Sequence, residues 1–329
     1  MDMRTATNNE LITAEQVDLS SLNSIRKFAT KWVDNAPPRR LDMVILCAST
    51  FAFPPRKGEF PEATEDGFEL SWAVNYVANF HLLSILSPAL RAQPPDRDVR
   101  IIISTCSSYM AGQLSELLSE QGKASKNITK QGGDKTQTNT SKSAQAQSVK
   151  DVKAQDKFRA SYKSAYATSK LALMTFASAY QKHISSYKRP DKHPSNARII
   201  MVDPGFTRTP SMRRYLSNGS ILGLLIYLLS WPLWWLVLKG PDDGAQIYLH
   251  AAMEPQFGQG EGGWFLKECK ERQVARNEIK DEGLQKNLWE LTDKAIQAME
   301  KEGATRRARK KKESVVMPEN ANSNASGKG

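Results

Sequence analysis

Three short runs of apolar residues recur along the chain, and stretches with helical spacing separate them. The runs cover residues 41–48, 99–104 and 198–202, and their apolar residues are continuous rather than alternating. Continuous apolar runs of this length are typical of parallel strands that are buried on both faces of a sheet. The pattern therefore predicts an α/β fold with a doubly wound parallel sheet, in which ligands bind beyond the carboxyl ends of the strands.

Apolar residues with helical spacing fill the gaps between these strands. Ser20 or Ser21 can cap a helix that begins near residue 22, and further helices are predicted over about 64–90 and 160–186. Five apolar residues near the C-terminus also share one helix face, which we expect to pack against the body: Leu284, Leu288, Leu291, Ala295 and Met299.

One apolar stretch interrupts this alternation. Residues 221–238 contain no charged side chain, and Arg213, Arg214 and Lys239 flank them. The stretch just reaches the length of a membrane span, but Pro232 and the tryptophans around it favour a shallow hairpin or an interfacial helix. We therefore expect the segment 219–239 to contact a membrane or a lipid droplet. The alternative is a buried helix or flap of a soluble domain.

Charge is divided unevenly along the 329 residues. The net charge is +11, but segments 122–157 and 301–329 each carry a net charge of +5, so the rest of the chain is nearly neutral. The first segment lacks aromatic residues and is rich in Lys, Gln, Ser and Thr, and the second contains the basic run 306–312. Both compositions predict disorder. The neutral body disfavours nucleic acid as a partner, and the basic tail suits an anionic membrane surface.

The cysteines and the N-terminus indicate the compartment. Cys47, Cys106 and Cys269 are odd in number and have no metal-ligand spacing. They predict neither a disulfide framework nor a metal site, and they favour a reducing, intracellular compartment. Residues 1–16 are polar and lack the apolar core of a signal peptide.

A tyrosine and a lysine lie four residues apart near the start of the third predicted helix. This spacing places the side chains of Tyr166 and Lys170 on one helix face. A cation beside a phenol stabilises the phenolate, so we expect Lys170 to lower the pKa of Tyr166. Tyr166 would then exchange a proton with an alcohol or a carbonyl while a nicotinamide carries the hydride. The alternative is a partly exposed pair on a helix surface.

Six features in a fixed order extend this pair over about residues 17–265. They are VDLSSL at 17–22, LDMVIL at 41–46, AVNY at 73–76, RIII at 100–103 before a serine-rich turn, YATSK at 166–170 and PGFTRT at 204–209. In this order the chain resembles the short-chain dehydrogenase/reductase family. Within it, the chain looks most like the retinol-dehydrogenase-like branch and like fungal members that associate with membranes or lipid droplets. The resemblance implies a Rossmann-like fold and an NAD(P)-dependent oxidoreductase.

The resemblance also assigns roles to individual residues. It implies that Tyr166 is the general acid/base, that Lys170 binds the nicotinamide ribose, and that Asn75 holds Lys170 through a water. It implies that Asp18 contacts the adenine. Four residues after the last predicted strand would line the nicotinamide: Pro204, Gly205, Thr207 and Thr209. The implied cofactor is NADP or NAD, and only the family resemblance favours NADP.

The serine of the family's active site has no clear counterpart. Strict register places Cys106 at its position, and a thiol is a poor hydrogen-bond donor. A shift of one residue makes Ser107 our candidate for polarising the substrate carbonyl. Cys106 and Ser108 remain the alternatives.

The start of the chain departs furthest from the family. The family's first strand and glycine-rich turn cradle the cofactor pyrophosphate, and residues 1–16 contain no glycine. We therefore expect a sheet that lacks the first βαβ unit. A truncated chain and a non-catalytic descendant both fit this pattern, and we favour truncation because Asn75, Tyr166 and Lys170 are all in place.

The sequence thus predicts three parts: residues 1–16, which match nothing in the family, a Rossmann-like domain over 17–300 that carries the insert and the apolar segment, and a basic tail over 301–329. The predicted activity is the interconversion of an alcohol and a carbonyl on a lipophilic substrate. We expect the protein on an intracellular membrane, at the endoplasmic reticulum or a lipid droplet. The alternative is a non-catalytic, membrane-associated binding or scaffold protein of the same fold.

Overall fold

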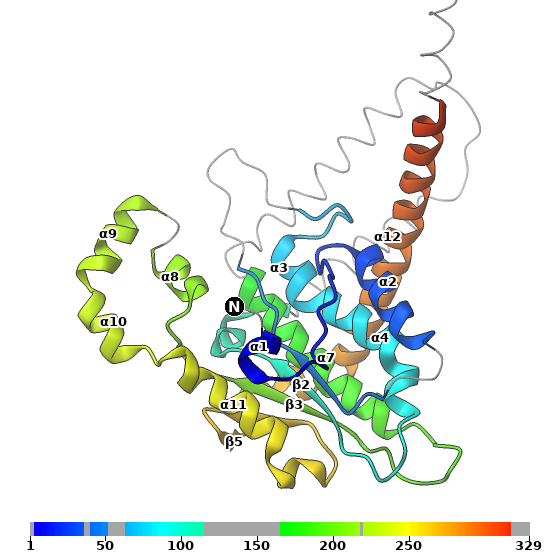
Figure 1. The fold of residues 1–329 in the computed structure, drawn as a ribbon, viewed down its shortest axis with the longest axis horizontal. Coiled ribbons are helices and arrows are strands. Elements are labelled where there is room, and N and C mark those ends of the chain that lie inside the picture. The colour runs from blue at the N-terminus through cyan, green and yellow to red at the C-terminus, as the bar shows by residue number, and fades with distance from the viewer. Residues whose placement is uncertain (1–2, 36–39, 52–62, 115–164, 218–219, 317–329) are drawn as a thin grey trace, which may run out of the picture.

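A computed structural model of the chain has helices packed on both sides of a central sheet (Figure 1). It describes residues 3–35, 40–51, 63–114, 165–217 and 220–316. The predicted insert 122–157 lies outside the described residues.

Five strands form one sheet, in the same order as in the chain. The parallel strands are β1 (Met43–Leu46), β2 (Val99–Ser104), β3 (Ala197–Asp203) and β4 (Trp264–Lys267), and β5 (Lys270–Arg272) runs antiparallel beside β4. The three apolar runs that predicted strands are β1, β2 and β3, so the Rossmann-like α/β fold is confirmed.

The N-terminal residues differ from the family pattern. The chain begins with α1 (Met3–Thr7) and reaches α2 (Leu22–Val33), which Ser21 caps by accepting a hydrogen bond from the Ser24 amide. Residues 17–20, which begin the first of the six family features, form coil and a turn. Within the described part of the chain, β1 pairs only with β2.

One face of the sheet carries the larger part of the core. It is covered by α3 (Leu70–Trp72), the π-helical turn η1 (Ala73–Val77), α4 (Ala78–Arg91) and α7 (Ala165–Ser185). Ile101 and Ile103 of β2 point into this layer, where they belong to the same apolar cluster as Phe176 of α7. Outside it lie α2 and α12 (Glu282–Val316), and the predicted apolar face of α12 supplies Leu288 to the cluster.

The opposite face of the sheet is covered by α11 (Pro241–Met253). Ile102 and Ile200 point to this side because successive strand residues alternate between faces. They pack against Ile247 and Ala251 of α11 and against Phe257 in the short helix η4 (Pro255–Gly258). The two cores account for the continuous apolar composition of the strands.

Two helices differ from what their composition alone suggests. The helix Leu70–Arg91 is long and apolar enough to cross a membrane, but 72% of its most apolar window is buried inside the fold, as expected of a core helix. The tail predicted to be disordered from residue 301 instead starts within α12, which continues to Val316. The first part of the tail therefore prolongs a packed helix, and residues 317–329 lie outside the described structure.

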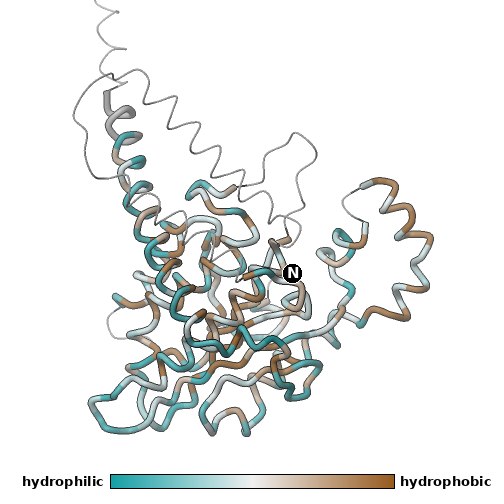
Figure 2. The backbone as a smooth tube through the Cα atoms, turned by 180° about the vertical axis from the view of Figure 1, so that it is seen from behind, coloured by the Kyte–Doolittle hydropathy of each residue, from teal (hydrophilic) through white to brown (hydrophobic). Residues whose placement is uncertain are grey.

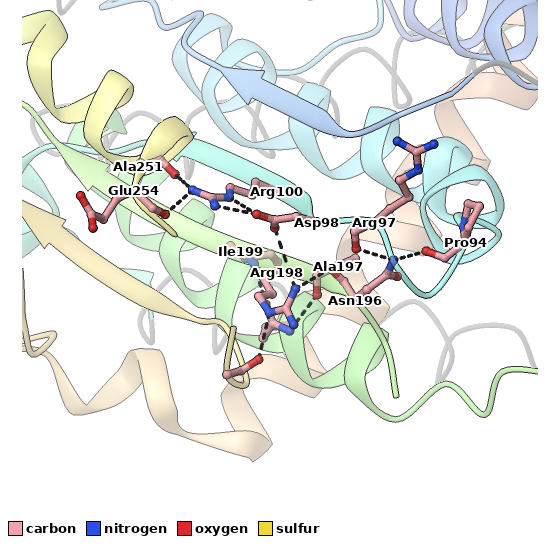
Figure 3. Close-up of polar contacts among 12 residues, drawn as sticks. Pro94, Arg97, Asp98, Arg100, Asn196, Ala197, Arg198, Ile199, Ala251 and Glu254 are labelled. Atoms are coloured by element: carbon pink, nitrogen blue, oxygen red, sulfur yellow. Dashed lines mark hydrogen bonds and ion pairs between the residues drawn. The ribbon is translucent and has the colours of Figure 1, made fainter. Parts of the chain in front are cut away.

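Polar contacts close the amino ends of β2 and β3, far from the carboxyl edge (Figure 3). Arg100 is 5% exposed, and its guanidinium donates to Asp98 and to the carbonyls of Ala251 and Glu254. These bonds fix the end of α11 against β2. Asn196, which precedes β3, donates to the carbonyls of Pro94 and Arg97 and ties the two strands together there.

A helical excursion leaves the body between β3 and α11. It contains α8 (Pro210–Leu216), α9 (Ile221–Leu229) and α10 (Trp231–Val237), and it projects away from the sheet in Figure 1. Its two ends meet in a bridge in which the Arg208 amide donates to Lys239 O and the Lys239 amide donates to Phe206 O. The apolar stretch 221–238 is therefore two short helices joined at Ser230 rather than one long helix.

Candidate active site

Chemically reactive side chains collect at the carboxyl edge of the sheet. Strand β1 leads to residues 47–51, β2 leads to residues 105–108, and β3 ends at Asp203 before the loop 204–209. Tyr166 and Lys170 reach the same edge from the first turns of α7. This is the edge at which parallel α/β sheets bind ligands.

Tyr166 lies half-buried between an aromatic ring and a thiol. Its ring meets the Phe51 ring edge-on at 5.4 Å, and its hydroxyl lies 3.5 Å from Cys106 Sγ. Burial is the largest cause that raises the pKa of Tyr166 above its usual range, and the neighbouring Cys106 adds to it. The predicted lowering of this pKa by Lys170 is wrong for this arrangement. The phenol is held in its protonated form.

Lys170 is a buried cation beside Tyr166. Its side chain is 2% exposed, its Nζ lies 5.8 Å from the centre of the Tyr166 ring, and it donates to Ser104 O at 3.2 Å. Burial lowers the pKa of Lys170, while the Coulombic effects of Cys106 and Asp203 oppose that shift. The pair predicted from the sequence spacing therefore faces the site rather than solvent.

Asn75 is fully buried in the π-helical turn η1, a kind of turn that often occurs at functional sites. Its Oδ1 accepts from Ser49 Oγ at 3.1 Å and from the Thr50 amide at 2.8 Å. Its Nδ2 donates to Thr50 O at 2.9 Å and to Ser169 Oγ at 3.0 Å. Asn75 thus ties the loop after β1 to α7, one residue from Lys170.

The three candidates for the serine role have different surroundings. Ser107 Oγ donates to Asp203 Oδ2 at 2.6 Å and accepts from Lys267 Nζ at 2.9 Å. Cys106 Sγ lies beside the Tyr166 hydroxyl and 2.7 Å from Ser108 Oγ. The structure therefore brings Cys106 to Tyr166, with Ser108 bonded to Cys106, and it places Ser107 among charged groups at the ends of β3 and β4.

The loop after β3 has the geometry of a tight turn. Gly205 has a φ of +76°, a conformation that favours glycine, and its amide donates to Asp203 Oδ1 at 2.9 Å. A side chain at Gly205 would also meet Glu268. Thr209 caps α8 by accepting from the Met212 amide, and Thr207 packs against Gly244 of α11. Pro204 to Thr209 therefore lie in one ordered turn at the carboxyl edge.

Asp18 stands apart from the other predicted site residues. It is exposed, and its carboxylate accepts from the amide and hydroxyl of Ser20 just before α2. This is the local geometry of a turn. The contacts of Asp18 in the structure do not connect it to Tyr166 or to Asn75.

Several residues of the site escaped the sequence reasoning. Asp203 is 1% exposed and organises both Ser107 and Gly205, and its position directly before Pro204-Gly205 was the available signal. Phe51 and Lys267 had no sequence signal, because only the folded sheet brings them to the site. No group of three or more potential metal ligands lies together in the described residues.

The donors at this edge suit the sugar and nicotinamide half of a dinucleotide. Tyr166 and the buried ammonium of Lys170 offer adjacent hydrogen-bond donors that match vicinal hydroxyls, as on a ribose. The backbone of the Pro204–Thr209 turn offers amides and carbonyls of the kind that a carboxamide pairs with. Residues at this edge therefore fit a nicotinamide nucleoside.

Several relatives of the chain are named oxidoreductases or dehydrogenases. An uncharacterized oxidoreductase of Schizosaccharomyces pombe is 38% identical over 95% of this chain and 74% of its own length. An uncharacterized oxidoreductase of Saccharomyces cerevisiae is 36% identical over 93% of this chain and 71% of its own length. Retinol dehydrogenase 14 of Homo sapiens is 25% identical over 86% of this chain and 66% of its own length. No model of a protein family matches the chain.

Proposed function

The chain belongs to the short-chain dehydrogenase/reductase family, and from this premise we propose that it is an NAD(P)-dependent oxidoreductase that interconverts an alcohol and a carbonyl on a lipophilic substrate. The observation that carries the proposal is the placement of Tyr166 and the buried Lys170 at the carboxyl edge of the sheet. A bound nicotinamide supplies or accepts the hydride. Family resemblance alone favours NADP over NAD.

Tyr166 is the proposed proton donor and acceptor. Its raised pKa keeps the hydroxyl protonated, so it is ready to donate to the oxygen of a carbonyl during reduction. Lys170 would bind the ribose and supply positive charge as the phenolate forms. Asn75 positions this pair through Ser169 and fixes the loop that carries Phe51.

We propose different roles for the three candidates for the family's active-site serine, which are Cys106, Ser107 and Ser108. Cys106 with Ser108 would lie beside the substrate oxygen, because this pair adjoins the Tyr166 hydroxyl. Ser107, our sequence candidate, would instead hold Asp203 and Lys267 in place. A Cys106→Ser variant, which restores the better hydrogen-bond donor, should keep or raise turnover. A Ser108→Ala variant should lower it.

The contacts of other residues with the cofactor are also part of the proposal. Pro204, Gly205, Thr207 and Thr209 would line the nicotinamide and its carboxamide, and Asp18 would approach the adenine. The turn geometry of Gly205 supports the first assignment. The exposure of Asp18 leaves its carboxylate accessible to a ligand.

The lipophilic substrate is supported by two observations. One relative is named retinol dehydrogenase 14, and the ring of Phe51 covers the Tyr166 side chain. We also propose that the segment 219–239 contacts an intracellular membrane or a lipid droplet.

The test is hydride transfer by the purified protein. NADPH or NADH oxidation is followed at the nicotinamide absorbance with retinal and a panel of other lipophilic carbonyls. Tyr166→Phe should reduce turnover by roughly 100-fold or more because it removes the proton donor. Tyr187→Phe, at an exposed surface tyrosine, is the matched control and should change nothing. Unchanged turnover in Tyr166→Phe would refute the mechanism, and no turnover with either cofactor would favour a binding or scaffold protein.

A further inference from the structure

We propose that the helical excursion α8–α10 docks on one leaflet of a membrane that contains anionic lipids, inserts α9 and α10 among the acyl chains, and binds headgroup phosphates with Arg213 and Arg214. The surface docking is independent of the reaction. The delivery of substrate from the membrane to Tyr166 rests on the proposed function.

The apolar surface of the excursion is large and continuous. Twelve side chains of α9 and α10 are large, hydrophobic and between 40% and 84% exposed. They are Ile221, Leu222, Leu224, Leu225, Ile226, Leu228, Leu229, Trp231, Leu233, Trp235, Leu236 and Val237. Figure 2 shows the resulting hydrophobic lobe, which stands apart from the body of the protein. Soluble monomers rarely expose so many adjacent apolar residues, so this surface has a partner.

The length of the two helices limits how deep the lobe can reach. α9 has nine residues and α10 has seven, and Ser230 joins them. At about 1.5 Å per residue neither helix approaches the roughly 30 Å of a hydrocarbon core. Insertion into one leaflet satisfies the apolar side chains without carrying polar backbone across the bilayer.

Charges at the base of the lobe favour a lipid surface over another apolar protein. Arg213 and Arg214 are exposed on α8, and the Arg208 guanidinium lies 5.4 Å from the centre of the Trp235 ring. These arginines border the side chains that would enter the leaflet, at the level where phosphates lie. Arginine binds phosphate oxygens through paired hydrogen bonds, and a cationic rim around an apolar lobe matches an anionic bilayer.

The arginines face a formed groove between α8 and α9. The groove has a volume of about 540 Å³, and its lining includes Arg213, Arg214, Ser217, Ser220, Ile221 and Leu224. The lining combines cationic and hydroxylic side chains with aliphatic ones, as the junction between a headgroup and an acyl chain requires. Gly223 lets the two helices touch, because a side chain there would overlap the Ser217 carbonyl. The groove is therefore built by backbone contact.

An aromatic path connects this surface to the site. Tyr215 of α8 meets the Phe51 ring at 5.3 Å, and Phe51 meets Tyr166 at 5.4 Å. The bridge at residues 206–208 and 239 fixes the base of the excursion beside the Pro204–Thr209 turn. A lipophilic substrate that leaves the leaflet along α8 would pass the rings of Tyr215 and Phe51 before it reaches the Tyr166 hydroxyl.

Vesicle flotation tests the docking without any substrate. The protein is mixed with phosphatidylcholine vesicles that contain or lack one-fifth phosphatidylserine. Arg213→Glu/Arg214→Glu should reduce the fraction bound to the anionic vesicles by about tenfold or more, because each basic residue near the surface contributes measurably to binding. Lys286→Glu/Lys294→Glu makes the same charge change on exposed lysines of α12 and should leave binding unchanged. Equal loss in both pairs would overturn the headgroup assignment.

A second pair of variants tests the insertion. Leu229→Asn/Leu236→Asn changes one residue of α9 and one of α10, 84% and 80% exposed, and should abolish flotation with little effect on unfolding. Quenching of Trp235 by lipids brominated near the headgroup should exceed quenching by lipids brominated near the chain ends. Retained flotation would overturn the insertion. A loss of flotation accompanied by conversion of a dimer to a monomer in sedimentation would assign the lobe to a second copy of the chain.

The delivery path has a readout that does not need turnover. Vesicles that carry a photoactivatable long-chain alcohol should label peptides of α9 and α10 and also the peptide that contains Tyr215. Labelling confined to α9 and α10 would overturn delivery along α8 while leaving docking intact. Failure of hydride transfer with normal flotation would instead count against the proposed function.

Discussion

The most informative perturbation of the site is Asn75→Ala. The side chain is fully buried and makes four hydrogen bonds, to Ser49 Oγ, to Ser169 Oγ and to both backbone groups of Thr50. Truncation removes all four at once. The loop after β1 then loses its connection to η1 and α7.

The cost follows from the groups left behind. Ser49 is exposed and can bind water, and Ser169 Oγ keeps its bond to Tyr166 O at 2.7 Å. The amide and carbonyl of Thr50 lose a partner in a half-buried position, at about 1–3 kcal/mol for each unsatisfied group. Partial access of water favours the lower half of that range. We expect Asn75→Ala to lower the free energy of unfolding by about 2–4 kcal/mol.

Asn79→Ala supplies the matched control. Asn79 is also a buried asparagine, one helical turn later, and its side chain donates one bond, to Asn75 O. The truncated volume is the same, so the cavity costs are comparable, and we expect a loss of about 1 kcal/mol. Urea unfolding at neutral pH measures both variants. Equal losses in the two variants would refute the assignment of the difference to the bonds of the loop.

The same variant has a spectroscopic consequence. Asn75 fixes residues 49–50, and the next residue, Phe51, covers Tyr166. Because burial is the main cause of the raised pKa of Tyr166, release of the loop should move that pKa down toward its ordinary value. Ultraviolet titration of the tyrosines in Asn75→Ala, with Tyr166→Phe to identify the signal, would detect the shift.

Two further predictions concern the body of the protein. A Cβ at Gly244 would overlap the methyl of Thr207, so Gly244→Val should destabilise the protein by about 1–3 kcal/mol in urea, whereas Gly283→Ala in the first turn of α12 should not destabilise it. Burial lowers the pKa of His81, although Glu300 opposes that shift. In the unfolded chain the pKa of a histidine is about 6.5, so the unfolded chain binds the His81 proton more tightly than the folded chain does. The free energy of unfolding should therefore fall as the pH drops below that value. His81→Gln should flatten the dependence between pH 7 and pH 5.5, and an unchanged slope would contradict it.

Local pattern was sufficient to predict the framework. The apolar run at residues 99–104 is β2 to the residue, and the helix predicted over 160–186 is α7 at Ala165–Ser185. Burial on both faces leaves a signature in the composition of each strand, and Ser21 caps α2 through contacts within four residues. The spacing of Tyr166 and Lys170 likewise needed only one turn of helix. Such features depend on neighbours in the chain, so the sequence carries them directly.

The parts that could not be predicted depend on distant partners. Whether Ser107 or Cys106 faces Tyr166 is decided by Asp203, which holds Ser107 from 96 residues away. The raised pKa of Tyr166 comes mainly from burial by distant parts of the chain, which include the ring of Phe51, rather than from its helical neighbour. The basic composition of residues 301–316 suggested disorder, but α12 is anchored upstream by the bond between Tyr76 and Thr292 and extends through the basic run. Tertiary contacts overrode local composition in each case.

The bridge between Arg208 and Lys239 closes the excursion at its base, so the excursion and the body of the protein are joined at a single place. Because both ends of the excursion meet at one point, its interior can lengthen, shorten or change composition without moving β3 or α11. Closing a shorter loop at the same point even costs less chain entropy, by about 0.6 kcal/mol for each halving of its length. The segment that we propose to bind the membrane can therefore change while the side chains at the carboxyl edge of the sheet stay in place. A chimera that replaces residues 210–238 with a short turn should keep the sheet and the Tyr166 side chain in place. It should lose the proposed membrane docking and the contact between Tyr215 and Phe51.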